Sequence, residues 1–232
     1  LVVQAYLKHA PAVIDWLAEL ARAGGRRIPV RLVKGAYWDS EIKRAQEQGL
    51  DGYPVYTRKA ATDISYIACA RRLLNLGELF YPQFATHNAR TLATVAELSG
   101  AEVVAFEFQR LHGMGKALYA ALGETHDQSA PCRVYARVGS HKDLLPYLVR
   151  RLLENGANTS FVNRLADDAA PIDDVIRSPA GIIGDAPYQP HPGIPLPARL
   201  FAAERENSAG VDLSDKASLA PLLAGIEDAL GA

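Results

Sequence analysis

Short apolar segments alternate with longer amphipathic ones along the first two thirds of the chain, and this alternation constrains the fold more than any other feature. The expected strands are residues 1–6, 28–34, 80–86, 102–108 and 132–138. The expected helices are residues 11–24, 39–48, 58–76, 88–99, 114–122 and 141–155. Repeated strand–helix units with short connections indicate a parallel sheet with helical crossovers.

Two architectures provide such a sheet, a (β/α)8 barrel and a doubly wound sheet. Polar residues at or just past the predicted strand ends favour the barrel, whose active sites are built at that edge. They are Gln4, Lys34, His87, Gln109 and Arg137. No Gly-x-Gly-x-x-Gly motif follows a strand, which disfavours a dinucleotide-binding sheet. We therefore expect an α/β chain in which residues 1–170 form about the last five of the eight units of a TIM-type barrel.

The two ends of the chain predict that it belongs to a larger protein. It begins with LVVQAY, without Met or a leader, and reads as a strand already under way, so we expect further units before residue 1. Residues 171–199 are rich in Pro and Gly, which is typical of a linker, and a last helix is expected over residues 215–230. We assign residues 171–232 to a linker and the start of a following domain.

Composition excludes several classes of protein. The chain has 25 Lys and Arg against 26 Asp and Glu, and a net charge of −1 argues against nucleic-acid binding. A hydrophobic content of 49% fits an ordinary globular chain, and no apolar run approaches the roughly 18 residues of a membrane span. Cys69 and Cys132 lie in apolar stretches, so we expect buried, reduced thiols and a reducing compartment.

The segment RLVKGAYWD, which begins at Arg31, is the first candidate for chemistry. Arg31 and Val33 share one face of the predicted strand, because side chains alternate along a strand. A charged side chain in an apolar strand needs a polar or anionic partner. Arg31 therefore either points at a ligand or forms a structural salt bridge with a neighbouring strand, and Gly35 would let the backbone approach a ligand closely.

The helix over residues 141–155 is the second candidate. Tyr147, Arg150, Arg151 and Glu154 follow an i, i+3, i+4, i+7 spacing, which places them on one helical face. Two adjacent guanidinium groups suit a carboxylate, which arginine binds through paired hydrogen bonds, and Glu154 could hold one of them in place. The alternative is a solvated face with an ordinary Arg–Glu pair.

Three weaker signals follow other strands. His87, within Thr86-His87-Asn88, either contacts a cofactor or caps the next helix. Residues 109–115 contain two glycines that would allow a tight loop near a ligand. Tyr135 lines a pocket or packs in the core. No second histidine stands at metal-ligand spacing from His87, so we expect no metal site.

Five blocks of the sequence together resemble a known family. The blocks are VRLVKGAYWDSEIKRAQ, YPVYTRKAATDISY, PQFATHNART, FEFQRLHGMG and YLVRRLLENGANTSFVN. They closely resemble the proline dehydrogenase domain of bacterial bifunctional proline utilization A flavoproteins, and the resemblance covers almost the whole chain. The segment PLPARLFAAERENSAGVDLSD resembles the passage leading into the second enzyme of those proteins, an aldehyde dehydrogenase.

This resemblance implies a distorted (β/α)8 barrel that holds FAD at the carboxyl ends of its strands. The implied reaction is oxidation of L-proline to 1-pyrroline-5-carboxylate on the route to glutamate, with electrons passing to a membrane quinone. The implied protein is cytoplasmic and can associate peripherally with the inner membrane. At full length it would form homo-oligomers and carry a C-terminal 1-pyrroline-5-carboxylate dehydrogenase domain, and no nucleic acid is expected for this segment.

The resemblance also assigns site residues. Arg31 matches an arginine near the reactive edge of the flavin, and Tyr37 matches a gate residue. Arg150 and Arg151 match the pair that binds the proline carboxylate, and Glu154 matches an acidic residue that organises them. Residues around the proline ring match Leu111, Tyr135 and Tyr147. The flavin-contacting positions match Gln4, Arg31, Val33, Lys34, Gly35, Ala36, Trp38, Thr57, Lys59, Thr62, Thr86, His87 and Asn88.

There is one departure from the family pattern, and two alternatives remain open. A lysine and an aspartate on earlier strands of the family would precede residue 1, as would the DNA-binding module of some members, so we expect this chain by itself to be incomplete for turnover. One alternative is an aldolase-type lyase in which Lys34, at a strand end, forms a Schiff base. The other is a non-catalytic fragment that only contacts a partner domain.

Overall fold

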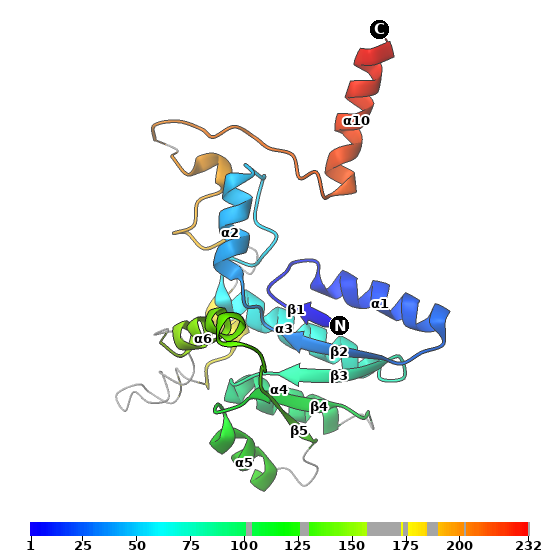
Figure 1. The fold of residues 1–232 in the computed structure, drawn as a ribbon, viewed down its shortest axis with the longest axis vertical. Helices are drawn as coiled ribbons and strands as arrows, with labels where there is room; N and C mark the ends of the chain where they lie inside the picture. Colours follow the sequence, from blue (N-terminus) through cyan, green and yellow to red (C-terminus); the bar gives the residue numbers. More distant parts are fainter. Residues whose placement is uncertain are drawn as a thin grey trace. The chain divides into compact units, whose positions relative to one another are not determined.

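In the computed structural model, five parallel strands form a single sheet (Figure 1). The strands are β1 (Val2–Gln4), β2 (Ile28–Val33), β3 (Phe80–Ala85), β4 (Glu107–Leu111) and β5 (Cys132–Tyr135). Each strand lies beside the previous one, in the order β1-β2-β3-β4-β5. In a (β/α)8 barrel, each strand likewise lies beside the previous one in sequence. In a doubly wound sheet, the strand order reverses at a switch point. The α/β class and the parallel sheet expected from the sequence are therefore confirmed.

The structure describes residues 1–100, 104–125, 130–156, 173, 176–184, 190–201 and 203–231, and these divide into two compact units. The first unit comprises Leu1–Lys34 and Ala60–Pro187, and the second comprises Gly35–Lys59 and Tyr188–Ala232. Besides the sheet, the first unit contains α1 (Ala10–Gly24), α3 (Lys59–Asn75), α4 (Ala89–Gly100), α5 (Lys116–Thr125), α6 (His141–Gly156) and α9 (Pro179–Ile183). The second unit contains α2 (Trp38–Glu47), the 3-10 turn η1 (Pro197–Arg199) and α10 (Lys216–Gly231).

One face of the sheet is apolar and covered by helices of the first unit. Val30 and Leu32 on β2, and Phe80 and Phe84 on β3, are fully buried in one cluster with side chains of α1, α3 and α4. The ring of Phe108 on β4 belongs to the same cluster. Burial of this apolar area removes it from water and is the main stabilising contribution to the unit.

The opposite face of the sheet, here called the inner face, is polar. Because side chains alternate along a strand, the residues between the buried apolar ones all point to this face. The strand register places Gln4 beside Val33, Arg31 beside Gln83, and Gln83 beside Glu107. It also places Gln109 beside Arg133, and Leu111 beside Tyr135. Helices on one face and polar groups on the other are the arrangement of a barrel wall that surrounds a site.

Two local expectations are wrong. The fourth strand was expected over residues 102–108 but spans Glu107–Leu111, so Gln109 lies inside the strand and not at its end. The apolar run was mistaken for the strand, because a strand that carries Glu107 and Gln109 on a polar inner face has little apolar pattern of its own. Cys132 is exposed, whereas Cys69 is buried as expected.

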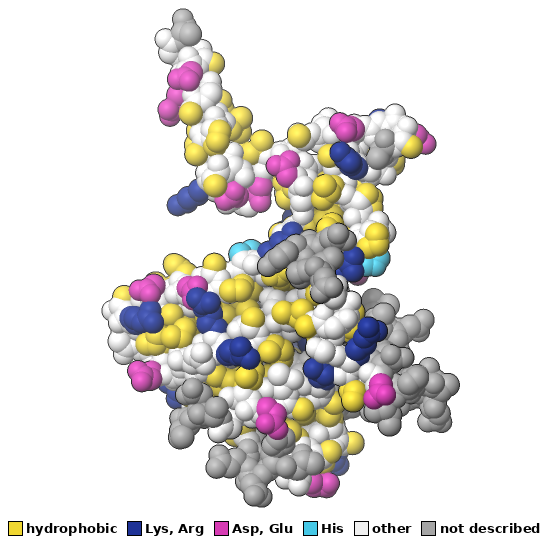
Figure 2. Space-filling view, turned by 180° about the vertical axis from the view of Figure 1, so that it is seen from behind, with side chains coloured by type: hydrophobic (Ala, Val, Ile, Leu, Met, Phe, Trp, Pro, Cys, Tyr) yellow, Lys and Arg dark blue, Asp and Glu magenta, His cyan; other side chains and the backbone are white. Residues whose placement is uncertain are grey.

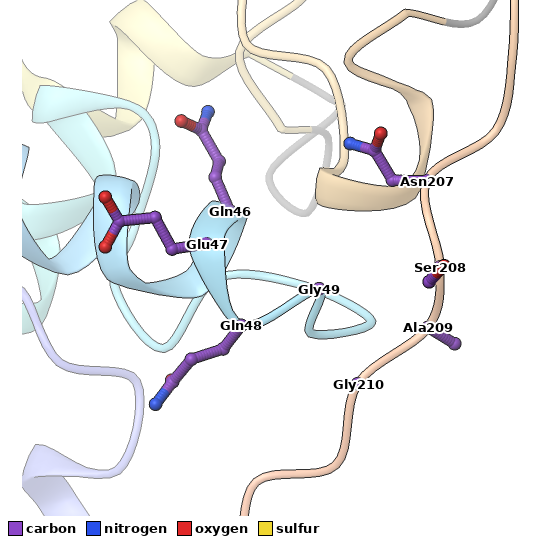
Figure 3. A pocket seen from close by; sticks show the side chains of 8 residues that line it. All are labelled: Gln46, Glu47, Gln48, Gly49, Asn207, Ser208, Ala209 and Gly210. Atoms are coloured by element: carbon purple, nitrogen blue, oxygen red, sulfur yellow. The ribbon is translucent and has the colours of Figure 1, made fainter.

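The second unit is held together by the proline-rich segment, which packs along residues 35–59. The Tyr53 hydroxyl donates to the carbonyl of Pro195 at 2.6 Å, and the backbone N–H of His191 donates to Thr57 Oγ1 at 2.9 Å. Residues 207–210 run beside the end of α2 (Figure 3), where Gly210 N–H donates to the Gly49 carbonyl at 2.9 Å. A Cβ on Gly210 would lie 1.7 Å from a backbone oxygen, so only glycine allows this approach.

The surface agrees with the near-neutral composition. On the side of the molecule shown in Figure 2, basic and acidic side chains are scattered among apolar ones and form no single charged patch among the described residues. None of the described helices is both long enough and apolar enough to cross a membrane.

Candidate functional site

A chain of hydrogen bonds crosses the inner face from β2 to β5. Arg31 Nε donates to Gln109 Oε1 at 2.7 Å, and Gln109 Nε2 donates to Glu107 Oε1 at 2.7 Å. Gln83 Nε2 donates to the same carboxylate at 2.9 Å, as does the Tyr81 hydroxyl at 3.2 Å. The Arg31 side chain therefore has a partner on β4, which is an amide and not the carboxylate of a structural salt bridge.

Glu107 is the buried anion of this face, with only 2% of its surface exposed. Arg133 binds its carboxylate through two nitrogens, at 2.7 and 2.8 Å. The hydrogen bonds from Arg133 are the main reason that the pKa of Glu107 falls to about 2, although burial acts in the opposite direction. Glu107 is therefore ionised at neutral pH, and its charge is balanced by Arg133.

Arg31 itself faces aromatic and cationic groups. Its guanidinium lies 5.7 Å from the centre of the Tyr135 ring, a distance typical of a cation–π contact. Burial is the largest cause of a lowered pKa of Arg31, and the positive charge of Arg151 lowers it further. Three expected site residues, Arg31, Tyr135 and Arg151, are thus brought together at one end of the inner face.

Helix α6 supplies Arg151 together with its neighbours. The guanidinium of Arg151 lies 5.5 Å from the centre of the Tyr147 ring, one helical turn before it. Arg150 precedes it on the helix and is half-buried. The side chain of Glu154 lies outside the described residues, so its expected role as an organiser of the two arginines stays a prediction.

His87 completes this end of the site. The backbone N–H of Leu111 donates to His87 Nε2 at 3.1 Å, which leaves the ring proton on Nδ1 when the imidazole is neutral. Burial, and then the charges of Arg151, Arg110 and Arg31, lower the pKa of His87 to about 4. At neutral pH the residue is therefore an uncharged ring whose Nδ1–H is a potential donor.

The turns that surround His87 have clear local causes. Asn88 Oδ1 accepts a hydrogen bond from Thr91 N–H at 2.9 Å, so Asn88, and not His87, caps α4. Gly115 adopts a φ of 69° in the loop after β4, and a Cβ there would lie 3.1 Å from the His87 ring. The close loop expected from the glycines of residues 109–115 is therefore present.

The other expected flavin positions in the first unit are mostly engaged with protein groups. Lys34 Nζ forms an ion pair with Asp63. The hydroxyl of Tyr119 donates to the Thr86 carbonyl at 2.8 Å, and Thr62 is buried in α3. Gln4 and Val33 lie side by side on the inner face, with part of each side chain exposed.

The remaining expected positions belong to the second unit, which is described separately. Gly35 adopts a φ of 144°, a backbone conformation that side chains disfavour, so glycine is required directly after β2. Trp38 Nε1 donates to the Tyr56 carbonyl at 2.8 Å, and Tyr37 is 47% exposed. Expected residues that also lie in this unit are Ala36, Thr57 and Lys59.

Two further features of the described residues bear on where a ligand could bind. Within the described ranges, no three His, Cys, Asp or Glu side chains gather as metal ligands. A shallow hollow of about 400 Å³ lies between the end of α2 and residues 207–210 (Figure 3), and it contains none of the expected site residues.

The sequence reasoning missed the carboxylate at the centre of this hydrogen-bond chain and two of its partners. Glu107, Gln83 and Arg133 were not singled out, although they share the inner face with Arg31. A signal was present, since Glu107 and Gln109 are separated by one residue and so point to the same side of a strand. The misplaced fourth strand hid that signal.

The polar inner face and the arginines beyond the strand ends define a barrel-type enzyme of the α/β class, with a site suited to an anionic ligand. Comparison with known families makes the assignment specific. The family model for proline dehydrogenase matches residues 1–164, so the chain belongs to the proline dehydrogenase family.

Several relatives are similar to nearly the whole chain. The bifunctional protein PutA of Klebsiella aerogenes is 55% identical over 232 residues, which cover 95% of this chain and 18% of that protein. The protein of the same name from Rhizobium meliloti is 50% identical, over 98% of this chain and 19% of that protein. This chain therefore spans about a fifth of the length of these relatives.

Solved structures agree with the fold. A crystal structure of Bradyrhizobium japonicum proline utilization A matches with a TM-score of 0.91 and 56% identity, covering 98% of this chain and 23% of that one. The Bdellovibrio bacteriovorus protein of that name, inactivated by N-propargylglycine, matches with a TM-score of 0.80 and 32% identity, over 100% of this chain and 23% of that one.

Proposed function

We propose that this chain forms part of a FAD-dependent proline dehydrogenase, which oxidises L-proline to 1-pyrroline-5-carboxylate in the catabolism of proline to glutamate. The observation that carries the proposal is the convergence of Arg31, Tyr135 and Arg151 at one end of the inner face, in a chain of the proline dehydrogenase family. Proline is a small ring with a carboxylate, and such a substrate needs a cation for the carboxylate and an apolar wall for the ring.

The residues of this chain would bind and orient the substrate. Arg151, with Arg150 before it on α6, would hold the carboxylate through charge-assisted hydrogen bonds. The rings of Tyr135 and Tyr147 would cover the proline methylenes, together with Leu111. Tyr147 already lies against the Arg151 guanidinium, which restricts where that side chain can point.

The reaction needs no protein nucleophile. Proline, with its ring nitrogen in the amine form, loses a hydride from the ring carbon beside nitrogen and a proton from the nitrogen, and these losses leave the C=N bond of the product. When bound, FAD supplies the two-electron acceptor for that hydride.

The charges at the site suit a flavin nucleotide. Arg31, Arg110 and Arg151 all act on His87, whereas the carboxylate of Glu107 is already balanced by Arg133. The arginines therefore gather positive charge at this end of the inner face, which would attract anionic or electron-rich groups. Arg31 and His87 are the residues that we expect at the polar edge of the flavin, with Tyr37 as a gate.

The ion pair of Lys34 with Asp63 disfavours the lyase alternative. A Schiff-base lysine must lose its proton to act as a nucleophile, and a carboxylate partner stabilises the protonated form. If the protein binds no flavin but borohydride traps a substrate on Lys34, the lyase replaces our proposal. If neither signal is seen, the non-catalytic fragment replaces it.

The test uses a polypeptide that carries this chain together with the upstream barrel strands of the family. We expect a yellow flavin spectrum that L-proline bleaches. Changing Arg151 to Met should raise the KM for proline about tenfold or more while FAD stays bound, because one charge-assisted hydrogen bond contributes roughly 1.5–3 kcal/mol. Lys142→Met, an exposed cation on the same helix, is the matched control and should leave KM unchanged. An unchanged KM in Arg151→Met would overturn the carboxylate role.

Further proposals concern the full-length protein, its electron acceptor and its location. We propose that a membrane quinone accepts the electrons, and that a C-terminal 1-pyrroline-5-carboxylate dehydrogenase domain receives the product. The relatives are named bifunctional proteins, which supports the second of these proposals. We further propose a homo-oligomer at full length, located in the cytoplasm with peripheral association at the inner membrane.

A further inference from the structure

The Gln109 amide lies between two opposite charges, and these charges fix its orientation. Its oxygen accepts from Arg31 Nε, and its nitrogen donates to the Glu107 carboxylate, each at 2.7 Å. A flipped amide would place its oxygen against the carboxylate and its NH₂ group against the guanidinium, so both contacts would become repulsive. Gln109 is 6% exposed, and water cannot replace either partner freely.

The negative charge of Glu107 is balanced by Arg133 and not by Arg31. Arg133 binds both carboxylate oxygens, at 2.7 and 2.8 Å, so the ion pair of this face forms between β4 and β5. In the described part of the chain, no carboxylate forms an ion pair with Arg31. The amide therefore links Arg31 to the anion of this face without bringing the two charges into contact.

A small residue permits the link. Arg31 and Gln109 lie on β2 and β4, which are separated by the whole of β3, a span of roughly 9–10 Å between strand axes. Ala85 is the β3 residue beside Gln109 in the register. Its methyl group leaves room for the two long side chains to meet above the middle strand.

We propose that Gln109 and Glu107 are positioning residues, which fix Arg31 at the ligand while leaving its positive charge unneutralised. This inference rests on the proposed role of Arg31 beside the flavin. A direct Glu–Arg pair would hold Arg31 equally well but would cancel its charge. Holding it through an amide keeps a cation beside an electron acceptor, where it stabilises the reduced, more negative form.

Three variants separate this role from a structural one. Gln109→Leu removes both hydrogen bonds and should release Arg31. Gln109→Glu keeps the acceptor for Arg31 but places a second carboxylate against Glu107, so it is measured at a pH high enough for both carboxylates to be ionised. Gln83→Leu is the matched control, because it removes one hydrogen bond to Glu107 of the same kind and leaves the hydrogen bond between Arg31 and Gln109 in place.

The measurements use the flavin-loaded protein with a complete barrel. We expect both Gln109 variants to lower the midpoint potential of the bound flavin and to reduce kcat for proline about tenfold, the equivalent of one hydrogen bond to a charged group, with KM changed less than about twofold. Gln83→Leu should leave both quantities unchanged. A Gln109→Leu variant with the wild-type potential would overturn the proposal, as would a Gln83→Leu variant as impaired as Gln109→Leu.

A second measurement does not depend on proline oxidation. Nitrogen-15 NMR should show a slowly exchanging Nε–H signal of Arg31 in the wild type and in Gln83→Leu, and its loss in Gln109→Leu. If the wild type binds no flavin, the proposed function fails, while this signal still tests the link to Arg31. If Gln109→Leu does not fold, Gln109→Met carries the test, because it keeps the length of the side chain without its hydrogen bonds. A signal that exchanges equally fast in wild type and Gln109→Leu would overturn the link.

Discussion

The two faces of the sheet are built from the same five strands but follow different physical rules. On the helix-covered face, Val30, Leu32 and Phe84 pack against helices and contribute through burial alone. On the inner face, Arg31, Gln109 and Glu107 are joined by specific hydrogen bonds. An apolar core tolerates many combinations of side chains, whereas a chain of hydrogen bonds requires a particular donor or acceptor at each position. The helix-covered face therefore contributes mainly to the stability of the fold, and the inner face holds the polar groups proposed for the chemistry.

The largest expected effect is a difference in stability between substitutions at two neighbouring residues of β2. Leu32 is fully buried against the helices, and Leu32→Ala should lower the free energy of unfolding by about 2–5 kcal/mol, since it leaves a cavity. Val33 points to the inner face, and Val33→Ala should cost under about 1 kcal/mol. Urea unfolding followed by circular dichroism measures both changes. Equal losses would mean that the two faces do not differ in this way.

Acid should weaken the inner face through Glu107. Its pKa of about 2 in the folded protein is below the ordinary 4.5, so the unfolded chain binds the proton more readily. The stability from this group is present above about pH 4.5 and is lost as the pH falls towards 2, with a change on the order of 2 kcal/mol. Urea unfolding from pH 6 to 2.5 should show a steeper loss in the wild type than in Glu107→Gln. Parallel curves for the two proteins would contradict the prediction.

The smallest expected effect is on His87. Its imidazole should titrate near pH 4 in NMR, and Arg151→Met should raise that pKa while leaving it below the ordinary 6.5, because burial is its largest cause. Since the unfolded chain binds this proton more readily, His87 also makes the folded state less stable as the pH falls from about 6.5 towards 4. Lys142→Met should not change the titration. If Arg151→Met leaves it unchanged as well, Arg151 does not lie near His87 in solution.

Sequence reasoning predicted the helix-covered face well. The expected helix over residues 58–76 corresponds to α3 at Lys59–Asn75, and the expected strand over residues 28–34 corresponds to β2 at Ile28–Val33. Apolar periodicity is a local property of the chain and can be read without a structure. The same reasoning misplaced the fourth strand, because Glu107–Leu111 is stabilised by partners on β3 and β5 and not by its own apolar pattern.

The sequence named candidate site residues one by one, but it did not predict the contacts between them. The expected residues Arg31, Tyr135, Arg151 and His87 do come together at one end of the inner face. The partner of Arg31 remained open between a ligand and a salt bridge, and the structure shows a glutamine from a strand two places away. Cys132 was expected to be buried because its neighbours in the sequence are apolar, but it is exposed.

The sequence by itself determined the alternation of strands and helices, the placement of Arg31 and Val33 on one face of β2, and the family blocks, since each depends on neighbouring residues in the chain. Only the tertiary structure decided that an amide holds Arg31 and that Arg133 balances Glu107. Those pairings join residues that are 78 and 26 positions apart. The register between strands creates such contacts, and register depends on how the whole sheet packs against its helices.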